Sequence, residues 1–402
     1  MSNLKLHPRV SQLKPSATLG VKAKAKILRD QGHDVVDLSA GEPDFGTPQC
    51  IVDAAKRALD DGATRYTPVK GMDALIEACQ VKLKRDQGVS YDTSEIIHSV
   101  GAKAAIATAL ECLVGPGDEV ITFAPYWVSY PVQVELTGAT PVVVQTDRTQ
   151  GYLPSMADLD AAITSKTKLI ILNSPSNPTG VVWSEALLRE VAQRAQAHDL
   201  WIISDEIYEH LIFDETPHFS VASISEEIRA RTLLITGVSK GYAMTGWRVG
   251  ITAGPANVIK AMSSFQAQRY TCTAAVSQMA AAYAFSEPEE LRIEMVGMRK
   301  TFKQRRDLFM DLVEQTKGVL TAKPQGAFYA LIDVSCFCSQ TDAGQPDDVT
   351  FAENLLEQEF VAAVPGSAFG APGTLRFSLA SSEEALKSGF AGLARFIQHL
   401  AS

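Results

Sequence analysis

The sequence predicts an α/β protein built on a mainly parallel sheet that helices cover on both faces. Apolar runs of strand length alternate with amphipathic, helix-length stretches between about residues 95 and 255, which is typical of consecutive βαβ units. Several of these apolar runs end in glycine, asparagine or aspartate. At 402 residues, the chain is long enough for one large domain and a smaller second one.

Composition narrows the class of protein. The chain is 46% hydrophobic and 21% charged, as in ordinary globular proteins. Its net charge of −9 and the absence of a basic stripe argue against a nucleic-acid partner. No signal-peptide core or membrane-length apolar run is found, and the six scattered cysteines lack metal-site spacing. We therefore expect a cytoplasmic enzyme with reduced thiols, no metal and no membrane partner.

The N-terminal part reads as an arm over residues 1–20, a helix over 21–31 and a strand over 35–38. The strand runs into the turn Ser39–Phe45, with the sequence SAGEPDF. Glycine and proline after a strand expose backbone N–H groups, so this turn either binds a carboxylate or is only a turn.

The central part should alternate strands and helices. Helices are expected at 51–60, 72–87, 104–113 and 185–198, and strands at 96–100, 119–123, 140–145, 169–172, 200–204 and 232–236. The first of these strands ends at Gly101-Ala102-Lys103, directly before a helix. Free N–H groups at a helix N-terminus favour an anion, although such turns occur in any α/β protein.

Further polar and aromatic side chains follow the other strands. Trp127 lies in an aromatic cluster that either packs in the core or faces a ligand. Asn177 lies in a proline-rich loop, and Asp205 follows a buried strand. A buried carboxylate needs a partner, either a salt bridge or a cationic ring nitrogen. Because parallel strands end at one edge of a sheet, we expect these residues to lie together.

The stretch around Lys240 carries the most chemistry. Lys240 follows an apolar strand, with Ser239 beside it and Arg248 eight residues later. Burial lowers the pKa of a lysine, so that its free amine can attack a carbonyl. A guanidinium suits a phosphate. Pyridoxal phosphate carries an aldehyde and a phosphate; the alternative is a solvated lysine beside a surface arginine.

The C-terminal third has a different pattern. Helices are expected at 257–268, 274–286, 288–317, 351–358 and 383–401, and short strands at 327–333, 361–364 and 375–378. The long helix over 288–317 should lead into a second, smaller domain.

Six motifs together carry a family resemblance. They are SAGEPDF at 39–45, PYWVSY at 125–130, NSPSNPTG at 173–180, SDEIYEHL at 204–211, SKGYAMTGWRVG at 239–250 and LRFSLA at 375–380. In this order, and over essentially the whole chain, they resemble class I/II aminotransferases of pyridoxal-phosphate (PLP) fold type I, and among these bacterial aspartate aminotransferases most.

The resemblance implies a fold and its division. A large PLP-binding domain over residues 48–290 should hold a mainly parallel, seven-stranded sheet between helices. Residues 1–47, an arm and a small-domain segment, should join residues 291–402 in a smaller α/β domain.

The resemblance also implies roles at the cofactor. Lys240 should bond to the aldehyde of pyridoxal 5'-phosphate and carry the reaction's proton. Asp205 should hold the ring nitrogen, Tyr208 and Asn177 the phenolic oxygen, and Trp127 should stack on the ring. The phosphate-binding residues should be Gly101, Ala102, Lys103, Ser239 and Arg248, with Tyr66 reaching in from the other subunit of a homodimer with shared active sites. Gly237 departs from the family, in which a serine is common at this position, so one phosphate hydroxyl is missing.

For the substrate, Arg376 should clamp the α-carboxylate, helped by Asn177, Trp127 and the Gly41 backbone. Lys103 and Thr18 should hold a distal carboxylate, with Arg269 as a second candidate. A small-molecule amino acid and a 2-oxo acid are the expected partners, first L-aspartate and 2-oxoglutarate. An aromatic or prephenate aminotransferase, a PLP-dependent β-lyase, and a regulator that senses the cofactor are the alternatives.

Overall fold

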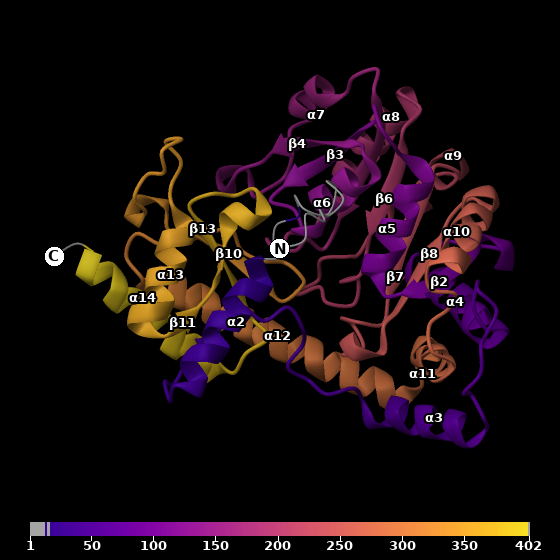
Figure 1. Ribbon diagram of the computed structural model, residues 1–402, viewed down its shortest axis with the longest axis horizontal. Helices are drawn as coiled ribbons and strands as arrows, with labels where there is room; N and C mark the ends of the chain where they lie inside the picture. The colour runs from indigo at the N-terminus through magenta and orange to yellow at the C-terminus, as the bar shows by residue number, and fades with distance from the viewer. Residues whose placement is uncertain (1–12, 14–16, 401–402) are drawn as a thin grey trace, which may run out of the picture.

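A sheet of seven strands forms the centre of the computed structural model, which describes residue 13 and residues 17–400 (Figure 1). In spatial order the strands are β2 (Ile96–Val100), β8 (Val249–Ala253), β7 (Thr232–Gly237), β6 (Trp201–Asp205), β5 (Thr167–Asn173), β3 (Glu119–Ala124) and β4 (Thr140–Gln145). All neighbours are parallel except the two pairs that β8 forms. The predicted seven-stranded, mainly parallel sheet is therefore confirmed.

Helices cover both faces of this sheet, as predicted. One face packs against α5 (Ala102–Leu113), α6 (Ser129–Thr137) and α10 (Ala256–Arg269). The other packs against α4 (Asp73–Asp86), α7 (Met156–Ala162), α8 (Glu185–Ala197) and α11 (Ala275–Ser286). Alternate residues of a strand supply the two faces, since Ile170 and Ile171 of β5 belong to different clusters.

Strand β8 is absent from the sequence prediction. It has a glycine in its middle, and glycine is unfavourable in strands. No side chain fits at Gly250, because a Cβ atom there would collide with the backbone of Gly101 and Ala102. Three helices, α6, α7 and α9 (Glu226–Arg229), were also missed, and α2 (Ala17–Asp30) begins four residues earlier than expected.

A second sheet is antiparallel and smaller. Its order is β12 (Val364–Pro365), β13 (Thr374–Ser378), β10 (Tyr329–Asp333) and β9 (Leu320–Thr321). Nearby, β1 (Val36–Asp37) pairs in parallel with β11 (Val361–Ala362), which joins the two ends of the chain. The packing helices are α12 (Glu289–Gln315), α13 (Asp348–Glu359) and α14 (Glu383–Leu400). The domain boundaries at residues 47 and 290 stay a prediction.

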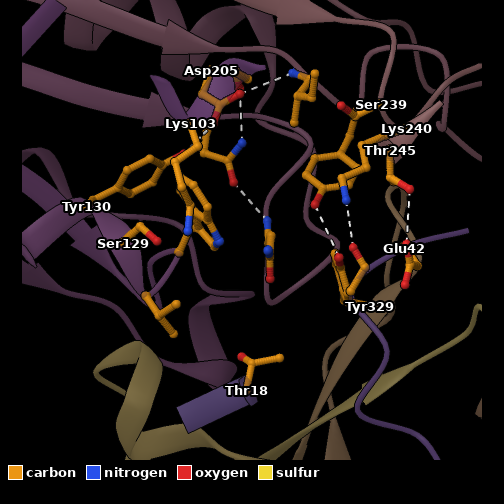
Figure 2. Close-up of a pocket in the computed structure, with 18 of the residues that line it drawn as sticks. Thr18, Glu42, Lys103, Ser129, Tyr130, Asp205, Ser239, Lys240, Thr245 and Tyr329 are labelled. Atoms are coloured by element: carbon orange, nitrogen blue, oxygen red, sulfur yellow. Dashed lines mark hydrogen bonds between the residues drawn. The ribbon is translucent and has the colours of Figure 1, made fainter. Parts of the chain in front are cut away.

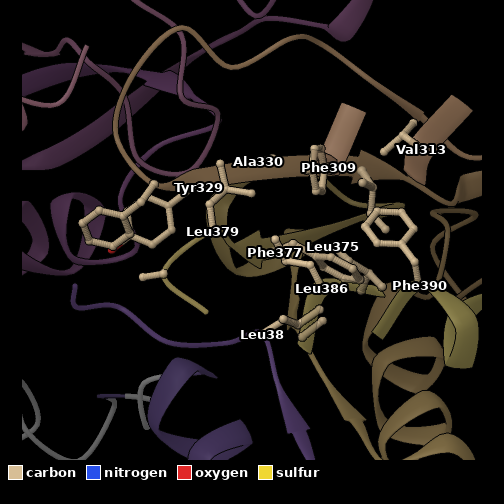
Figure 3. Close-up of a cluster of buried hydrophobic side chains, with 14 of the residues drawn as sticks. Leu38, Phe309, Val313, Tyr329, Ala330, Leu375, Phe377, Leu379, Leu386 and Phe390 are labelled. Atoms are coloured by element: carbon tan, nitrogen blue, oxygen red, sulfur yellow. The ribbon is translucent and has the colours of Figure 1, made fainter. Parts of the chain in front are cut away.

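Aromatic and aliphatic side chains fill the space between this sheet and its helices (Figure 3). Phe309 of α12 and Phe390 of α14 meet Phe377 of β13. Leu38, just after β1, belongs to the same cluster. The N-terminal segment is therefore part of the C-terminal core.

The remaining elements are short or peripheral. They are α3 (Gln49–Asp60), α9 (Glu226–Arg229) and the 3-10 helices η1 (Thr93–Glu95), η2 (Arg148–Gln150), η3 (Val221–Ser223), η4 (Thr245–Trp247), η5 (Ser335–Phe337) and η6 (Gly366–Phe369). None of the described helices is both long and apolar enough to cross a bilayer.

Candidate active site

A cavity of about 400 Å³ lies where the ends of the parallel strands meet the second sheet (Figure 2). Most of the predicted site residues line it: Thr18, Gly41, Ala102, Lys103, Trp127, Asn177, Asp205, Tyr208, Ser239, Lys240, Arg248 and Arg376. They come from α2, from the ends of six strands (β1, β2, β3, β5, β6 and β7) or the residues that follow them, from Arg248 just before β8, and from β13. The convergence that was expected at one sheet edge is therefore present.

Lys240 is partly buried and lines this cavity, just after β7. Its Nζ atom donates a hydrogen bond to the Gly41 carbonyl oxygen at 2.6 Å, and it forms no salt bridge with any residue that the structure describes. Burial lowers the pKa of Lys240 to about 8, against the opposing effect of Glu42. The solvated-lysine alternative is therefore wrong, and a large fraction of Lys240 is a free amine near pH 8.

Asp205 ends β6 and is 4% exposed. Its Oδ2 atom accepts a hydrogen bond from the Tyr130 hydroxyl at 2.7 Å, and Oδ1 accepts a longer one, 3.3 Å, from the Ile207 backbone N–H. Burial raises the pKa of the Asp205 carboxyl to about 6. Within residues 17–400 it has no salt bridge, so the core-salt-bridge alternative is wrong.

Arg376 occupies the middle of β13, where Leu375 and Phe377 on either side point into the core. Its Nη1 donates to the Asn177 side-chain oxygen at 3.2 Å and its Nη2 to the Ser39 carbonyl at 3.0 Å. The Nε atom is buried without a partner. The hydrogen bonds of this guanidinium therefore go to neutral oxygens, and an anion would complete its bonding.

The turn between β2 and α5 is shaped for an anion. Gly101 has a φ of +82°, and a Cβ atom there would lie 2.5 Å from Nη2 of Arg248. The guanidinium thus fits directly against the start of a helix whose first N–H groups are free. Arg248 also donates to the Thr245 carbonyl at 2.9 Å. Ser239 lines the same cavity.

Gly237, where the family resemblance implies that a serine is common, lies close against the neighbouring strand β8. A Cβ atom at Gly237 would lie 2.6 Å from the Val249 carbonyl oxygen of β8. A serine would meet this backbone before its hydroxyl could be used. The close pairing of β7 with β8 therefore leaves no room for a Cβ atom at this position unless the backbone shifts.

Lys103 lies in the first turn of α5, with its Nζ 5.0 Å from the centre of the Trp127 ring. Burial and the nearby Arg248 lower its pKa. Thr18 of α2 lines the same cavity. Arg269, the second candidate for a distal carboxylate, does not line the cavity, and its guanidinium lies 3.2 Å from Glu111.

Two predicted residues, Tyr66 and Gly101, do not line the cavity, and a third, Tyr208, has a partner that was not predicted. Tyr66 is 91% exposed and does not line the cavity. Tyr208 does line it, but its hydroxyl donates to the Tyr329 hydroxyl at 3.3 Å, and burial raises its pKa well above the usual value. Gly101 lies next to the cavity rather than in its lining.

The cavity also contains residues for which no role was predicted. Tyr130 bonds Asp205, and Tyr329 lies under Arg376 with 4.4 Å between the guanidinium carbon and the ring centre. Asn173 holds the Asp205 backbone oxygen at 3.0 Å. All three stood inside predicted strands or motifs, where neighbour contacts are not visible. Glu42 and Lys22 also line the cavity.

Comparison with known proteins identifies the family. The sequence model described as aminotransferase class I and II matches residues 33–391. The chain belongs to this family.

Relatives of this aminotransferase match over nearly their whole length. An aspartate aminotransferase from Geobacillus stearothermophilus is 44% identical, over 98% of this chain and 99% of the relative. An aspartate/prephenate aminotransferase from Thermus thermophilus is 42% identical, over 98% of each chain. A solved structure of the Thermus thermophilus aspartate aminotransferase with maleate has a TM-score of 0.92 at 42% identity, over 98% of this chain and 100% of that one. The predicted fold type I and transaminase class are confirmed.

Proposed function

We propose that this aminotransferase uses pyridoxal 5'-phosphate to transfer the amino group of L-aspartate to 2-oxoglutarate, giving oxaloacetate and L-glutamate. The observation that carries the proposal is a cavity with two cations, Arg376 and Lys103, neither of which forms a salt bridge with a described residue. Two such cations suit a substrate with two carboxylates. The relatives named for aspartate support this choice.

The residues of the cavity fit the cofactor. Lys240 offers an amine that burial keeps partly neutral. Asp205 offers a buried carboxylate that lacks a cation, and a protonated ring nitrogen would supply one. The Gly101 turn with Arg248 and Ser239 would hold the phosphate, with Ala102 and Lys103 supplying backbone N–H groups. Trp127, Asn177 and Tyr208 would contact the ring.

The cofactor, when bound, supplies an electron sink for the carbanion that forms at the substrate Cα atom. The protein's part is binding and proton transfer. Arg376, with Asn177 beside it, orients the α-carboxylate. Lys240 removes the Cα proton and returns one, since a pKa of about 8 allows both directions near neutral pH.

Tyr66 supports a homodimer with shared active sites. Its side chain is 91% exposed, so its hydroxyl is available to a neighbouring subunit. In the dimer, its hydroxyl would reach the phosphate in the other subunit. Sedimentation should give twice the chain mass, and Tyr66→Phe should weaken cofactor binding without changing that mass. A monomer with full activity would contradict the shared site.

A second substrate class has its own support. Relatives from Thermus thermophilus and Cereibacter sphaeroides are named for aspartate and prephenate. In this chain the apolar side chains of Leu19 and Trp127 share the cavity with Lys103. A bulkier acidic substrate is therefore the alternative that we would test next. A β-lyase would release pyruvate from a cysteine conjugate without a keto acid.

The first experiment follows the cofactor's absorption band in the pure protein as L-aspartate is added without any keto acid. Transamination predicts loss of the band of the Lys240-bound cofactor, growth of a pyridoxamine-type band, and one equivalent of oxaloacetate. L-alanine is the matched one-carboxylate donor and should react far more slowly. In Lys103→Ala, the preference for aspartate over alanine should fall by about tenfold or more. If that preference is unchanged, the role of Lys103 is wrong; if only alanine or an aromatic donor reacts, aspartate is wrong.

A further inference from the structure

Two charged side chains of the cavity have no part in the chemistry proposed above. They are Lys22 and Glu42, and Lys22 Nζ lies 3.7 Å from Glu42 Oε1. The other oxygen of Glu42 accepts a hydrogen bond from the Thr245 hydroxyl at 3.0 Å, which Figure 2 shows. The side chains are 38% and 55% exposed. An ion pair this long and this exposed is weak and exchanges readily.

Helix α2 presents one of its lysines to the cavity. Lys22 follows Thr18 by four residues, so both lie on one face of the helix, and both line the cavity. The other two lysines of the middle of α2 are engaged elsewhere: Lys24 bonds Glu353 at 2.7 Å, and Lys26 bonds Asp30 at 2.5 Å.

We infer that Lys22 is a specificity residue, which binds the distal carboxylate of dicarboxylic substrates together with Lys103. The inference rests on the proposed function and deepens it. Glu42 holds Lys22 at the cavity while no substrate is present, and the substrate carboxylate replaces Glu42 as its partner. Glu42 keeps its hydrogen bond from Thr245 during this exchange.

The charges of the substrate and of the cavity favour this replacement of Glu42 by the substrate carboxylate. A diacid brings two negative charges, and Arg376 takes one of them. Lys103 is partly desolvated, and its pKa is lowered by burial and by Arg248. The Lys22 side chain is 38% exposed. Two cations from two separate elements, α2 and α5, therefore select a second carboxylate better than either one.

The test measures binding of succinate and of butyrate to the cofactor-loaded protein by calorimetry. The two acids have the same carbon count and differ by one carboxylate. Lys22→Gln should weaken succinate about tenfold and leave butyrate unchanged. Lys26→Gln is the matched control, because it removes one lysine of the same helix outside the cavity, and it should change neither.

A double variant separates direct contact from screening. If Lys22 only neutralises Glu42, the pair of changes Lys22→Gln and Glu42→Gln should restore wild-type succinate binding, and the inference falls. If Lys22 contacts the substrate, the double variant stays weaker than Glu42→Gln alone by about the same tenfold factor. An unchanged preference in Lys22→Gln overturns the role of Lys22 alone. A wild-type protein that binds succinate no better than butyrate overturns the proposed dicarboxylate substrate as well.

Discussion

Lys82 is a buried lysine and Lys240 a partly buried one, and they differ in the partner of the amine. Lys82 of α4 is 1% exposed, and its Nζ lies 2.5 Å from Glu209 and 3.2 Å from Asp86. Lys240 donates instead to the Gly41 carbonyl oxygen, and no described carboxylate contacts it. A contacting carboxylate stabilises an ammonium, whereas a carbonyl does not cancel its charge.

The difference shows that burial alone does not make a lysine reactive. A desolvated lysine becomes reactive when it also lacks a counter-ion, because the ammonium is then unfavourable and the neutral amine is favoured. The two arrangements are linked through β7, since Thr236 donates to Glu209 at 2.5 Å only four residues before Lys240. One strand therefore supports a structural ion pair and a reactive amine side by side.

The largest expected effect comes from removing the reactive amine. Lys240→Ala should lower the transamination rate by about 10³-fold or more, because the proton carrier is lost. The thermal midpoint should not fall, since the change removes a desolvated group. Steady-state rates with aspartate and a melting curve measure both, with Lys240→Arg as the variant that keeps the charge. Activity within tenfold of wild type in Lys240→Ala would refute the assignment.

Breaking the paired lysine should act on stability instead. Lys82→Met leaves Glu209 buried without its cation, so the free energy of unfolding should fall by about 3–5 kcal/mol. Urea unfolding measures this loss. Adding Glu209→Gln to the same chain should recover part of it. The rate per folded molecule should change little, and a selective loss of rate would show that Lys82 serves the reaction.

The pH dependence sharpens the comparison. Lys240 has a pKa of about 8, below the usual 10.5, so cofactor-free protein should attach the cofactor aldehyde more slowly as pH falls through 8. In the unfolded chain this lysine keeps its proton up to 10.5, so its contribution to stability rises with pH between about 8 and 10.5. Rates of cofactor uptake from pH 6 to 10 locate the midpoint. A midpoint above pH 10 would place Lys240 with ordinary lysines.

The smallest expected effect comes from a substitution in β7, the strand that contacts Glu209 through Thr236 and leads into Lys240. Gly237→Ser should lower the free energy of unfolding by about 1–3 kcal/mol, because its Cβ meets the β8 backbone. Gly237→Ala is the steric control and should cost a similar amount. Cofactor affinity should not rise in the serine variant. A tighter cofactor with unchanged stability would show that the hydroxyl can be accommodated.

Sequence predicted the strand-end residues well because apolar runs and the motifs after them are local signals. Asp205, Lys240 and Arg376 each follow or interrupt such a run. Strand β8 was missed because Gly250 is set by its contact with the backbone of Gly101 and Ala102, which are far away in the sequence, and not by strand propensity. The Tyr130 bond to Asp205 joins residues 75 apart, and no local pattern records it.

The Lys82 ion pair was also missed, although a signal existed. Lys82 lies seven residues after Leu75 and three after Cys79, on the buried stripe of α4. A charged residue on such a stripe requires a buried partner. Its partner, Glu209, follows Tyr208 directly in a motif that was read only for its cofactor roles.

Helix α12 has a mechanical consequence for the whole molecule. Its 27 residues make a rod about 40 Å long. Leu291 near its start packs with the seven-stranded sheet, whereas Phe302 and Phe309 pack with the antiparallel one. Gly297 lies between these anchorages, with open space where a side chain would be. Any tilt of one sheet against the other would therefore bend α12. Gly297 is the residue at which this helix resists bending least, because glycine has a free backbone and a low helix propensity.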